Sequence, residues 1–518
     1  MKIEPNLCRF TIAGICWLAS DRDRDSLTEV AQALVRGGKL LRETPHRRVL
    51  LVGGRRPLIV KHFSPSGVAA NLKTLIRRSP ATREWIALRR AMRLGLPVPT
   101  PVAVGWRNSV VIRESFLVTE ALENTRSLGS YLYGEGKPAV VLRRRVVREA
   151  ALVLRRMHHA GIAHQDLHLD NLIVRSDDAG PTVHLIDFQR VAFYRSLNAK
   201  LRMLNLATLH GGCMEATRSE RLRFLKVYLG AGAEAMGDLR RLVAGIDKAG
   251  ARHRRHIWRS RQRRCLAENR EFKKIFLGQF VGMMRRDQDD AFQARLRQPP
   301  QLFTYARLTA SSLKKTVGRI DLADRAITVA RYHAGLSGAM KNLCASSCAR
   351  RAWVTGNSCV LRGLSTAVPL AYLERRHWRF RFEGYLINQT VKGGGLRESL
   401  AQCAREIGAK RRLIDDFARS MARLHNCDVA VGQLSAKDTI VSRKNGGFTF
   451  SIIDFDHVSL GPLSWRMRRA DLDGIAREFR GDPTISKTDR LRFLRGYLGV
   501  NFNTEWRKFG RGLHIQII

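Results

Sequence analysis

The stretch HQDLHLDNLIV, residues 164–174, decides how this sequence is interpreted. Four residues separate Asp166 from Asn171, and a run of β-forming residues follows directly. A second apolar run, VHLIDF, comes after the turn signal Asp-Ala-Gly-Pro and contains Asp187. The predicted hairpin returns the chain from Asn171 to Asp187, so three oxygen-bearing side chains are expected to lie close together.

The sequence contains an internal repeat. Residues 154–190 align without a gap with residues 421–457, so that a histidine near the start and an Asp-Phe pair near the end coincide. Further along, RLRFLKVYLG at residues 221–230 returns as RLRFLRGYLG at residues 490–499. Matched features in the same order indicate two copies of one domain.

Both copies show the same predicted local structure. A helix ends near His158 or His425, a polar loop follows, then a strand, a turn and a strand, and the sequence becomes helical again. We expect a first domain over residues 1–250, a basic helical linker over 251–300 and a second domain over 301–518.

Composition sets limits on the class of protein. The chain has 518 residues, 44% of them hydrophobic, which is enough for two packed domains. Its nine cysteines have no disulfide-framework spacing, so reduced thiols in the cytosol are expected. The N-terminal run CRFTIAGICWLAS is too short to span a bilayer. A soluble or peripheral protein is expected.

The polar residues of the first copy suit phosphoryl transfer, which requires positioning and charge neutralisation. Asp166 is the candidate base or hydroxyl-orienting group. Asn171 and Asp187 are candidate ligands of Mg²⁺, which prefers hard oxygen donors. His164 is expected to brace the loop. The sequence His-x-Asp, four residues, Asn, hairpin and Asp-Phe is the protein-kinase pattern, with Gln189 in place of the usual glycine.

Two upstream segments supply further candidates. Lys61 lies in the β-type run LIVKHF, and Glu84 lies near the start of a predicted helix that ends at a Gly-Leu-Pro stop. A Lys61–Glu84 pair would aim the ammonium at nucleotide phosphates. FLVTEALE, residues 116–123, is interpreted as an edge strand leading into a linker, with Glu120 and Leu122 placed to bind adenine through their backbone.

The first half resembles the lipopolysaccharide kinase group of the protein-kinase-like superfamily, which includes 3-deoxy-manno-octulosonic acid and core heptose kinases. The resemblance rests on IVKHF, on the helix ending in GLPVPTP, on HQDLHLDNLIV and on LIDFQR. It covers roughly residues 40–235, and more loosely 300–518. One departure is that ETPHRRVLLVGGRRP, before Lys61, lacks G-x-G-x-x-G, which leaves phosphate binding unexplained.

The resemblance implies an α+β fold of two tandem kinase-like domains, each with a small β-rich N-lobe and a helical C-lobe. It also implies use of ATP and Mg²⁺ to phosphorylate a sugar hydroxyl of a lipopolysaccharide-type glycolipid. The expected location is cytoplasmic, peripheral on the cytoplasmic face of the inner membrane.

The second copy has lost most of these residues. By the gapless alignment Asp166 becomes Gln433, His164 becomes Val431 and Asn171 becomes Asp438, whereas Asp187 is kept as Asp454. Over the strand and helix, Lys61 corresponds to Ala330, or to Arg331 after a one-residue slip, and Glu84 to Ala352. We predict a pseudokinase that stabilises, regulates or binds substrate, in which Asp438 and Asp454 remain a candidate cation pair.

The net charge of +47 predicts anionic partners. Two basic stretches are candidates for an anionic membrane surface, one from Arg47 and one around residues 252–264 with Trp258 as an interfacial ring. Either could instead be a solvated face. Two other functions stay open: a protein Ser/Thr or small-molecule kinase on the same fold, and a non-catalytic scaffold for nucleic acid or acidic partners. A nucleic-acid role is disfavoured by the 7% aromatic content and the absence of a nucleic-acid-binding motif.

Overall fold

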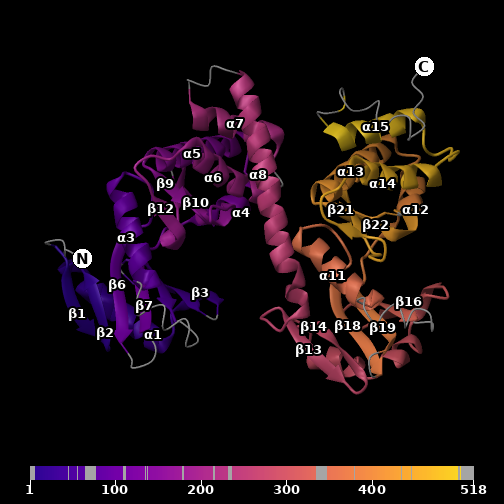
Figure 1. Cartoon of the computed structure of the whole chain (residues 1–518), viewed down its shortest axis with the longest axis horizontal. Helices are drawn as coiled ribbons and strands as arrows, with labels where there is room; N and C mark the ends of the chain where they lie inside the picture. The colour runs from indigo at the N-terminus through magenta and orange to yellow at the C-terminus, as the bar shows by residue number, and fades with distance from the viewer. Residues whose placement is uncertain are drawn as a thin grey trace. The chain divides into compact units, whose positions relative to one another are not determined.

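The computed structural model divides into two compact units, Met1–Arg254 and Arg255–Ile518. Each unit consists of a β-sheet followed by a mainly helical part (Figure 1). The structure describes residues 6–499 and 502 except 45, 55, 65–77, 109–112, 135, 137, 178–179, 214–215, 231–235, 334–346, 378–379, 433 and 445.

The sheet of the first unit is seven-stranded and antiparallel, in the order β1-β2-β6-β7-β5-β4-β3. Its strands are β1 Cys8–Ile12, β2 Ile15–Ala19, β3 Lys39–Thr44, β4 Arg47–Val52, β5 Leu58–Phe63, β6 Pro101–Asn108 and β7 Arg113–Glu120. Strand β7 pairs on both sides, with β6 and with β5. The expectation that residues 116–123 form an edge strand is therefore wrong, because two preceding strands, β5 and β6, pair with β7 on its two sides.

The sheet of the second unit repeats this order, as β13-β14-β18-β19-β17-β16-β15. Its strands are β13 Phe272–Leu277, β14 Phe280–Arg285, β15 Arg307–Ser311, β16 Lys315–Asp321, β17 Ala326–His333, β18 Pro369–His377 and β19 Phe380–Gln389. The two sheets correspond strand for strand. The predicted internal repeat and the α+β fold of two tandem domains, each with a β-rich part and a helical part, are confirmed.

The region expected to be a linker, residues 251–300, differs from the expectation in its second half. Helix α8, Met236–Gln262, and a 3-10 turn to Leu266 account for the helical part. Residues 272–285 then form β13 and β14, which correspond to the N-terminal hairpin β1–β2. Phe272, Ile275 and Leu277 are buried, but they are three and two residues apart, so the sequence lacks the regular two-residue alternation that indicates a strand.

The helical part of each unit contains the loop motifs. In the first unit its elements are α4 Leu128–Tyr133, α5 Val140–His159, α6 Ala199–Gly212 and α7 Arg218–Leu229, with strands β8 Thr125–Ser127, β9 Ile162–His164, β10 Leu172–Asp177, β11 Gly180–Leu185 and β12 Val191–Phe193. In the second unit they are α12 Leu396–Cys403, α13 Ile407–Asn426, α14 Trp465–Glu478 and α15 Lys487–Leu498, with β20 Gly394–Gly395, β21 Val429–Ala430, β22 Thr439–Lys444, β23 Gly447–Ile452 and β24 Ser459–Leu460. The predicted hairpins are β10–β11 and β22–β23.

Each sheet carries a packed helix that begins at an equivalent serine. Helix α3, Pro80–Arg93, is capped by Ser79, and α11, Cys348–Leu361, is capped by Ser347. Each serine hydroxyl accepts a hydrogen bond from a backbone N–H in the first turn, as expected of an N-cap. The caps therefore fix the register in which the two helices can be compared.

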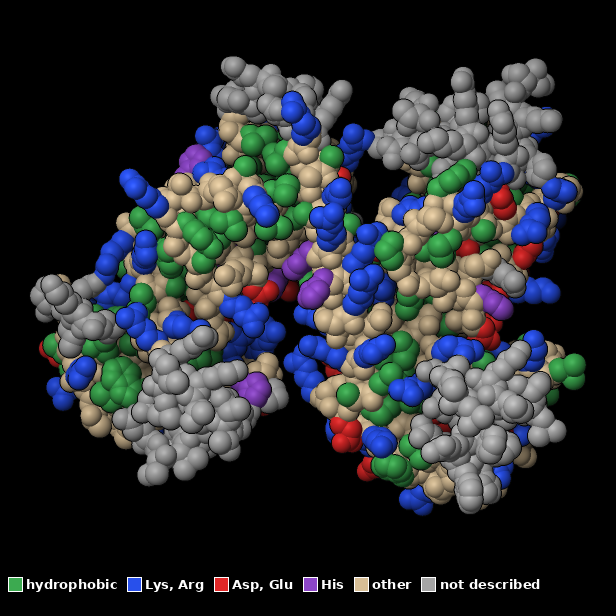
Figure 2. Space-filling model, viewed as in Figure 1, with side chains coloured by type: hydrophobic (Ala, Val, Ile, Leu, Met, Phe, Trp, Pro, Cys, Tyr) green, Lys and Arg blue, Asp and Glu red, His purple; other side chains and the backbone are tan. Residues whose placement is uncertain are grey.

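Lys and Arg side chains are spread over both units on the face shown in Figure 2. In the basic stretch of residues 252–264, however, Trp258 is only 7% exposed and lies under the Arg362 guanidinium, 4.6 Å from its ring centroid. Arg255 pairs with the buried Asp428 at 2.9 Å. Trp258 is thus a packing residue, and its expected role as an interfacial ring is wrong. None of the described helices is long and apolar enough to cross a membrane.

A buried histidine network supports the loop in each unit. In the first unit His158 Nδ1 lies 2.7 Å from the Tyr228 hydroxyl, and Asn205 Oδ1 lies 3.4 Å from His158 Nε2 and accepts the His164 N–H at 2.9 Å. In the second unit His425, Tyr497 and Asp471 make the matching set of contacts. The fold thus keeps this support in both copies.

We predict that Asn205→Ala lowers the free energy of unfolding by about 2–4 kcal/mol, because two buried groups lose their acceptor. Chemical denaturation measures the change. The control is Thr208→Ala on the same helix, which removes a bond only to the carbonyl of Leu204 and should cost less than about 0.5 kcal/mol. Equal losses for both variants would contradict this account.

Candidate active site

An ion pair joins the sheet of the first unit to helix α3. Lys61 on β5 donates to Glu84 Oε1 over 2.5 Å, and the Glu84 side chain is fully buried whereas that of Lys61 is 14% exposed. Strand β5 puts Lys61 on the sheet face that α3 covers, and Ser79 sets the helix register that brings Glu84 opposite it. The pairing expected from the sequence is present.

The loop after β9 holds Asp166 at the surface and His164 beneath it. The His164 ring is fully buried, its Nδ1 accepts from the Asp166 N–H at 3.3 Å, and its Nε2 donates to the Ile186 carbonyl at 3.2 Å. Burial lowers the pKa of His164, in agreement with a neutral ring that accepts at one nitrogen and donates at the other. The Asp166 carboxylate is 50% exposed, with His168 Nε2 4.0 Å from its Oδ1. His164 braces the loop and leaves the carboxylate accessible.

Asn171 and Asp187 carry oxygen atoms at the two ends of the β10–β11 hairpin, Asn171 just before it and Asp187 just after it. Asn171 Nδ2 donates to the Asp166 carbonyl at 2.8 Å, so its Oδ1 is the atom left for a metal. Its backbone carbonyl accepts from the Ile186 N–H at 3.0 Å, next to Asp187. The hairpin thus brings together the residues that the sequence predicted as neighbours.

Asp187 is held in an unusual backbone conformation and a positive environment. Its φ of 60° and ψ of 62° lie in the left-handed region, which costs a non-glycine residue about 1 kcal/mol or more and is characteristic of functional sites. Burial alone would raise its pKa, but the positive charges of Lys61 and Arg47 outweigh burial and lower it. Arg47 Nη1 lies 3.2 Å from Asp187 Oδ2. The carboxylate is therefore ionised and faces two cations.

The segment expected to bind adenine follows β7. The Glu120 carboxylate pairs with Arg56, the Ala121 N–H donates to the Pro57 carbonyl at 2.9 Å, and the Leu122 carbonyl accepts from the Thr125 hydroxyl at 3.2 Å. These bonds fix the path of the chain between the sheet and the helical part. Adenine binding by Glu120 and Leu122 stays a prediction.

The oxygen-bearing side chains of the site can be compared with the ligands that Mg²⁺ prefers. Among the described residues, no group of three or more His, Cys, Asp or Glu side chains could hold a metal. Mg²⁺ does not require such a group, since it keeps several waters and usually binds one or two carboxylates together with substrate phosphates. One carboxylate, Asp187, and one amide oxygen, Asn171 Oδ1, fit that requirement.

Strand register identifies the equivalents of Lys61 and Glu84 in the second unit. In the first unit the β5–β7 pairing starts at Leu58 with Glu120, and Lys61 with Leu117 is three residues further on. In the second unit the β17–β19 pairing starts at Ile327 with Gln389, and Ala330 with Leu386 is again three residues further on. Lys61 therefore corresponds to Ala330 without a slip.

The helices confirm the loss of the ion pair. Glu84 and Ala352 occupy the same position relative to the N-cap serines, Ser79 and Ser347. Arg331, the alternative equivalent of Lys61, instead forms an ion pair with Glu383 at 2.6 Å. Both members of the pair are thus replaced by buried alanines.

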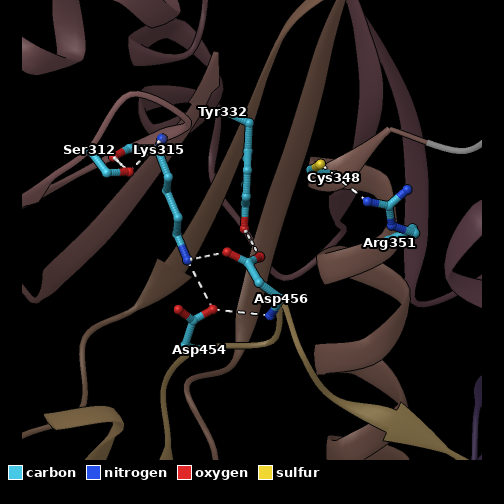
Figure 3. Close-up of polar contacts among 7 residues, drawn as sticks. All are labelled: Ser312, Lys315, Tyr332, Cys348, Arg351, Asp454 and Asp456. Carbon is cyan, nitrogen blue, oxygen red and sulfur yellow. Dashed lines mark hydrogen bonds and ion pairs between the residues drawn. The ribbon is translucent and has the colours of Figure 1, made fainter. Parts of the chain in front are cut away.

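A lysine occupies the degenerate second site (Figure 3). Lys315 Nζ donates to Asp454 Oδ1 at 2.9 Å and to Asp456 Oδ2 at 2.7 Å, and the Tyr332 hydroxyl donates to Asp456 Oδ1 at 2.8 Å. Burial would raise the pKa of Asp454, but Lys315 lowers it. Asp454 is absent from the described non-glycine residues with positive φ, in contrast to Asp187. The candidate cation pair of Asp438 and Asp454 thus has an ammonium group bound to one member.

Of the two other residues expected at the second site, the structure describes one. Val431, the equivalent of His164, is buried and its N–H donates to Asp471 Oδ2 at 2.8 Å. Gln433, the equivalent of Asp166, lies outside the described residues.

Two cations at these sites are not predicted from the sequence, Arg47 on the β3–β4 hairpin and Lys315 on the β15–β16 hairpin. Arg47 was interpreted as part of a membrane-binding stretch, but its side chain is 18% exposed and bonded to Asp187. The two cations are equivalent in strand register, since each begins a strand that pairs two residues beyond Lys61 or Ala330. In the sequence Arg47 precedes Lys61 by 14 residues and Lys315 precedes Ala330 by 15, so a gapless alignment does not match them.

Comparisons with known proteins identify the family. The model of the Lipopolysaccharide kinase (Kdo/WaaP) family matches residues 60–228 and again 362–497, together more than half of the chain. Lipopolysaccharide core heptose(I) kinase WaaP of Pseudomonas aeruginosa is 31% identical over 205 residues, which are 37% of this chain and 76% of that protein. WaaP of Escherichia coli K12 is 27% identical over 225 residues, 40% of this chain and 83% of that protein.

Two further relatives extend the comparison. The 3-deoxy-D-manno-octulosonic acid kinase of Xanthomonas campestris pv. campestris B100 is 29% identical over 171 residues, 32% of this chain and 64% of that protein. A solved structure described as WaaP in complex with acyl carrier protein is 26% identical, with a TM-score of 0.36, and the match covers 45% of this chain and 96% of that one.

We predict a pH-dependent gain of stability for Asp438→Asn. Burial and the charge of Asp454 raise the pKa of Asp438 from 3.8 to about 6, so the folded state holds this proton more tightly than the unfolded state. Ionisation therefore destabilises the fold as pH rises from about 4 to 6. The variant should be more stable than the wild type by about 1–2 kcal/mol at pH 7 and equal to it near pH 4. Thermal unfolding at both pH values measures this, and a gain that does not change with pH would contradict it.

Proposed function

The chain belongs to the lipopolysaccharide kinase (Kdo/WaaP) family, and we propose that its first unit transfers the γ-phosphoryl group of ATP to a sugar hydroxyl of a lipopolysaccharide-type glycolipid. The observation that supports this most strongly is the convergence of two cations and an oxygen-rich loop on Asp187. Lys61 is held by Glu84. The loop that contains Asp166 and Asn171 directly precedes the β10–β11 hairpin, and Asp187 comes just after that hairpin. The proposal of a sugar as acceptor is based on the relatives, which are named as kinases of heptose and of 3-deoxy-D-manno-octulosonic acid.

In the proposed reaction the chain positions the reactants and holds one proton. Asp166 accepts the proton of the acceptor hydroxyl as that oxygen bonds to the γ-phosphorus and the bond to the β–γ bridging oxygen breaks. The exposed Asp166 carboxylate is accessible to an acceptor outside the fold. His164 keeps the loop in place through the Asp166 N–H.

The nucleotide and metal would be held by the remaining residues. Lys61 would bind the phosphates, with Glu84 fixing its direction, and the backbone of residues 120–122 would bind adenine. Asn171 Oδ1 and the Asp187 carboxylate would hold Mg²⁺, which when bound neutralises the charge that builds up on the phosphates.

The second unit is proposed to be a pseudokinase. Ala330 and Ala352 replace the ion pair, Gln433 replaces the base in the sequence, and Lys315 is bonded to Asp454. A lost carboxylate base and a lost phosphate lysine remove residues that act as a unit. The unit then stabilises, regulates or binds substrate for the first.

The basic surface is proposed to bring the protein to its acceptor. The net charge of +47 suits an anionic glycolipid and an anionic membrane surface at the cytoplasmic face of the inner membrane. Because Trp258 and Arg255 serve in packing, the attraction is assigned to the spread of surface charge rather than to that stretch.

We predict that Asp166→Ala lowers the rate of phosphoryl transfer from labelled ATP by about 10²–10⁴-fold, since it removes the proton acceptor. Asp187→Asn should abolish transfer as well, because it removes the charged metal ligand. The matched substitution in the second unit, Asp454→Asn, should leave the rate within about threefold of the wild type. Unchanged turnover in Asp166→Ala would rule out catalysis by this loop and favour a non-catalytic scaffold.

The acceptor class is tested in the same assay with the wild-type protein. Label should enter a lipid-sugar extract and not added protein substrates or small alcohols. Transfer to protein alone would contradict the proposed acceptor while leaving the catalytic residues in place.

A further inference from the structure

The β3–β4 hairpin of the first sheet places an arginine over the candidate metal ligand. Strands β3 and β4 form this hairpin, and Arg47 is the first residue of β4 after its turn. The Thr44 hydroxyl donates to the Arg47 carbonyl at 3.1 Å across the turn. The guanidinium donates from Nη1 to Asp187 Oδ2 at 3.2 Å, with the two side chains 18% and 22% exposed. The hairpin thus directs a cation to the site where Lys61 also acts on Asp187.

The second unit carries a cation at the same place. Arg47 pairs across the strands with Phe63, two residues beyond Lys61, and Lys315 pairs with Tyr332, two residues beyond Ala330. Lys315 contacts Asp454, the equivalent of Asp187 (Figure 3). The cation is thus present in a unit that has lost the lysine–glutamate pair, so its position is linked to the aspartate and not to that pair.

The two cations differ in how firmly they are held. Lys315 is bonded to two carboxylates, and one of these is fixed by Tyr332. Arg47 contacts one carboxylate through one nitrogen, and arginine has five donors in a planar fork that suits phosphate oxygens. Arg47 can therefore exchange its partner by breaking one contact, whereas Lys315 would have to leave two carboxylates, Asp454 and Asp456.

The hairpin also lacks the glycine pattern with which kinases bind nucleotide phosphates through backbone N–H groups. A guanidinium at the same hairpin supplies an alternative set of donors. We propose that Arg47 is a phosphate-binding residue that pairs with Asp187 in the nucleotide-free protein and transfers to the nucleotide phosphates when Asp187 binds the divalent cation. This inference rests on the proposed function of the first unit.

The exchange predicts opposite effects on two ligands. Without Arg47 the nucleotide loses a charged contact to its phosphates, whereas a divalent cation alone no longer competes with a guanidinium for Asp187. A residue that only supported the fold would weaken both.

The test uses the full-length protein with Arg47→Ala and Arg47→Lys. The matched control is Arg48→Ala, because Arg48 is the next residue on the strand, 60% exposed and paired with Glu43. Binding of ATP and of adenosine is measured by calorimetry, and binding of Mn²⁺ without nucleotide by electron paramagnetic resonance. Arg47→Ala should bind ATP about tenfold more weakly, a change of about 1.4 kcal/mol, leave adenosine unchanged and bind Mn²⁺ several-fold more tightly. Arg47→Lys should stay within about threefold of wild type for ATP, and Arg48→Ala should match wild type for all three.

Several results would overturn the proposal. Equal loss of ATP and adenosine affinity, or weaker Mn²⁺ binding, in Arg47→Ala would assign Arg47 a supporting role only. Unchanged ATP affinity in a protein whose wild type binds ATP would contradict the inference and leave the proposed function standing. Failure of the wild type to bind ATP at all would contradict the proposed function itself. Arg47→Gln, which keeps the side-chain size, replaces Arg47→Ala if the alanine variant does not fold.

Discussion

The buried ion pair between Lys61 and Glu84 is the interaction on which the first site depends. It ties the sheet to helix α3 and directs an ammonium toward Asp187. Burying two charges is costly, and Glu84 Oε2 is buried with no hydrogen-bond partner among the residues that the structure describes. The second unit builds the same sheet and helix with Ala330 and Ala352 in these places, so the fold does not require the pair. The needs of the fold therefore do not account for the cost of burying this pair.

The repeat separates what the scaffold needs from what the chemistry needs. The histidine network beneath the loop is kept in both units, as are the N-cap serines and the order of the strands. The site itself differs in three ways: the ion pair, the strained backbone of Asp187 and the partner of the hairpin cation. In the second unit Lys315 is held by two carboxylates at the equivalent of the candidate metal ligand.

Much of this could be predicted from the sequence, because short motifs and local periodicity carried it. The loop, the β10–β11 hairpin and the Lys61–Glu84 pair rely on residue types at fixed spacing, and the repeat supplied its own alignment. Arg47 could not be found in this way, because its contact with Asp187 joins residues far apart in the chain and depends on strand register. The burial of Trp258 and the strands at residues 272–285 were missed because surrounding basic residues resemble an exposed helix.

The central claim is that one unit keeps a nucleotide site and the other has lost it. Counting bound nucleotide tests this most directly, by equilibrium dialysis of the full-length protein against labelled ATP with Mg²⁺. The account predicts one molecule of ATP per chain at saturation. Two equivalent sites per chain, or none, would contradict it.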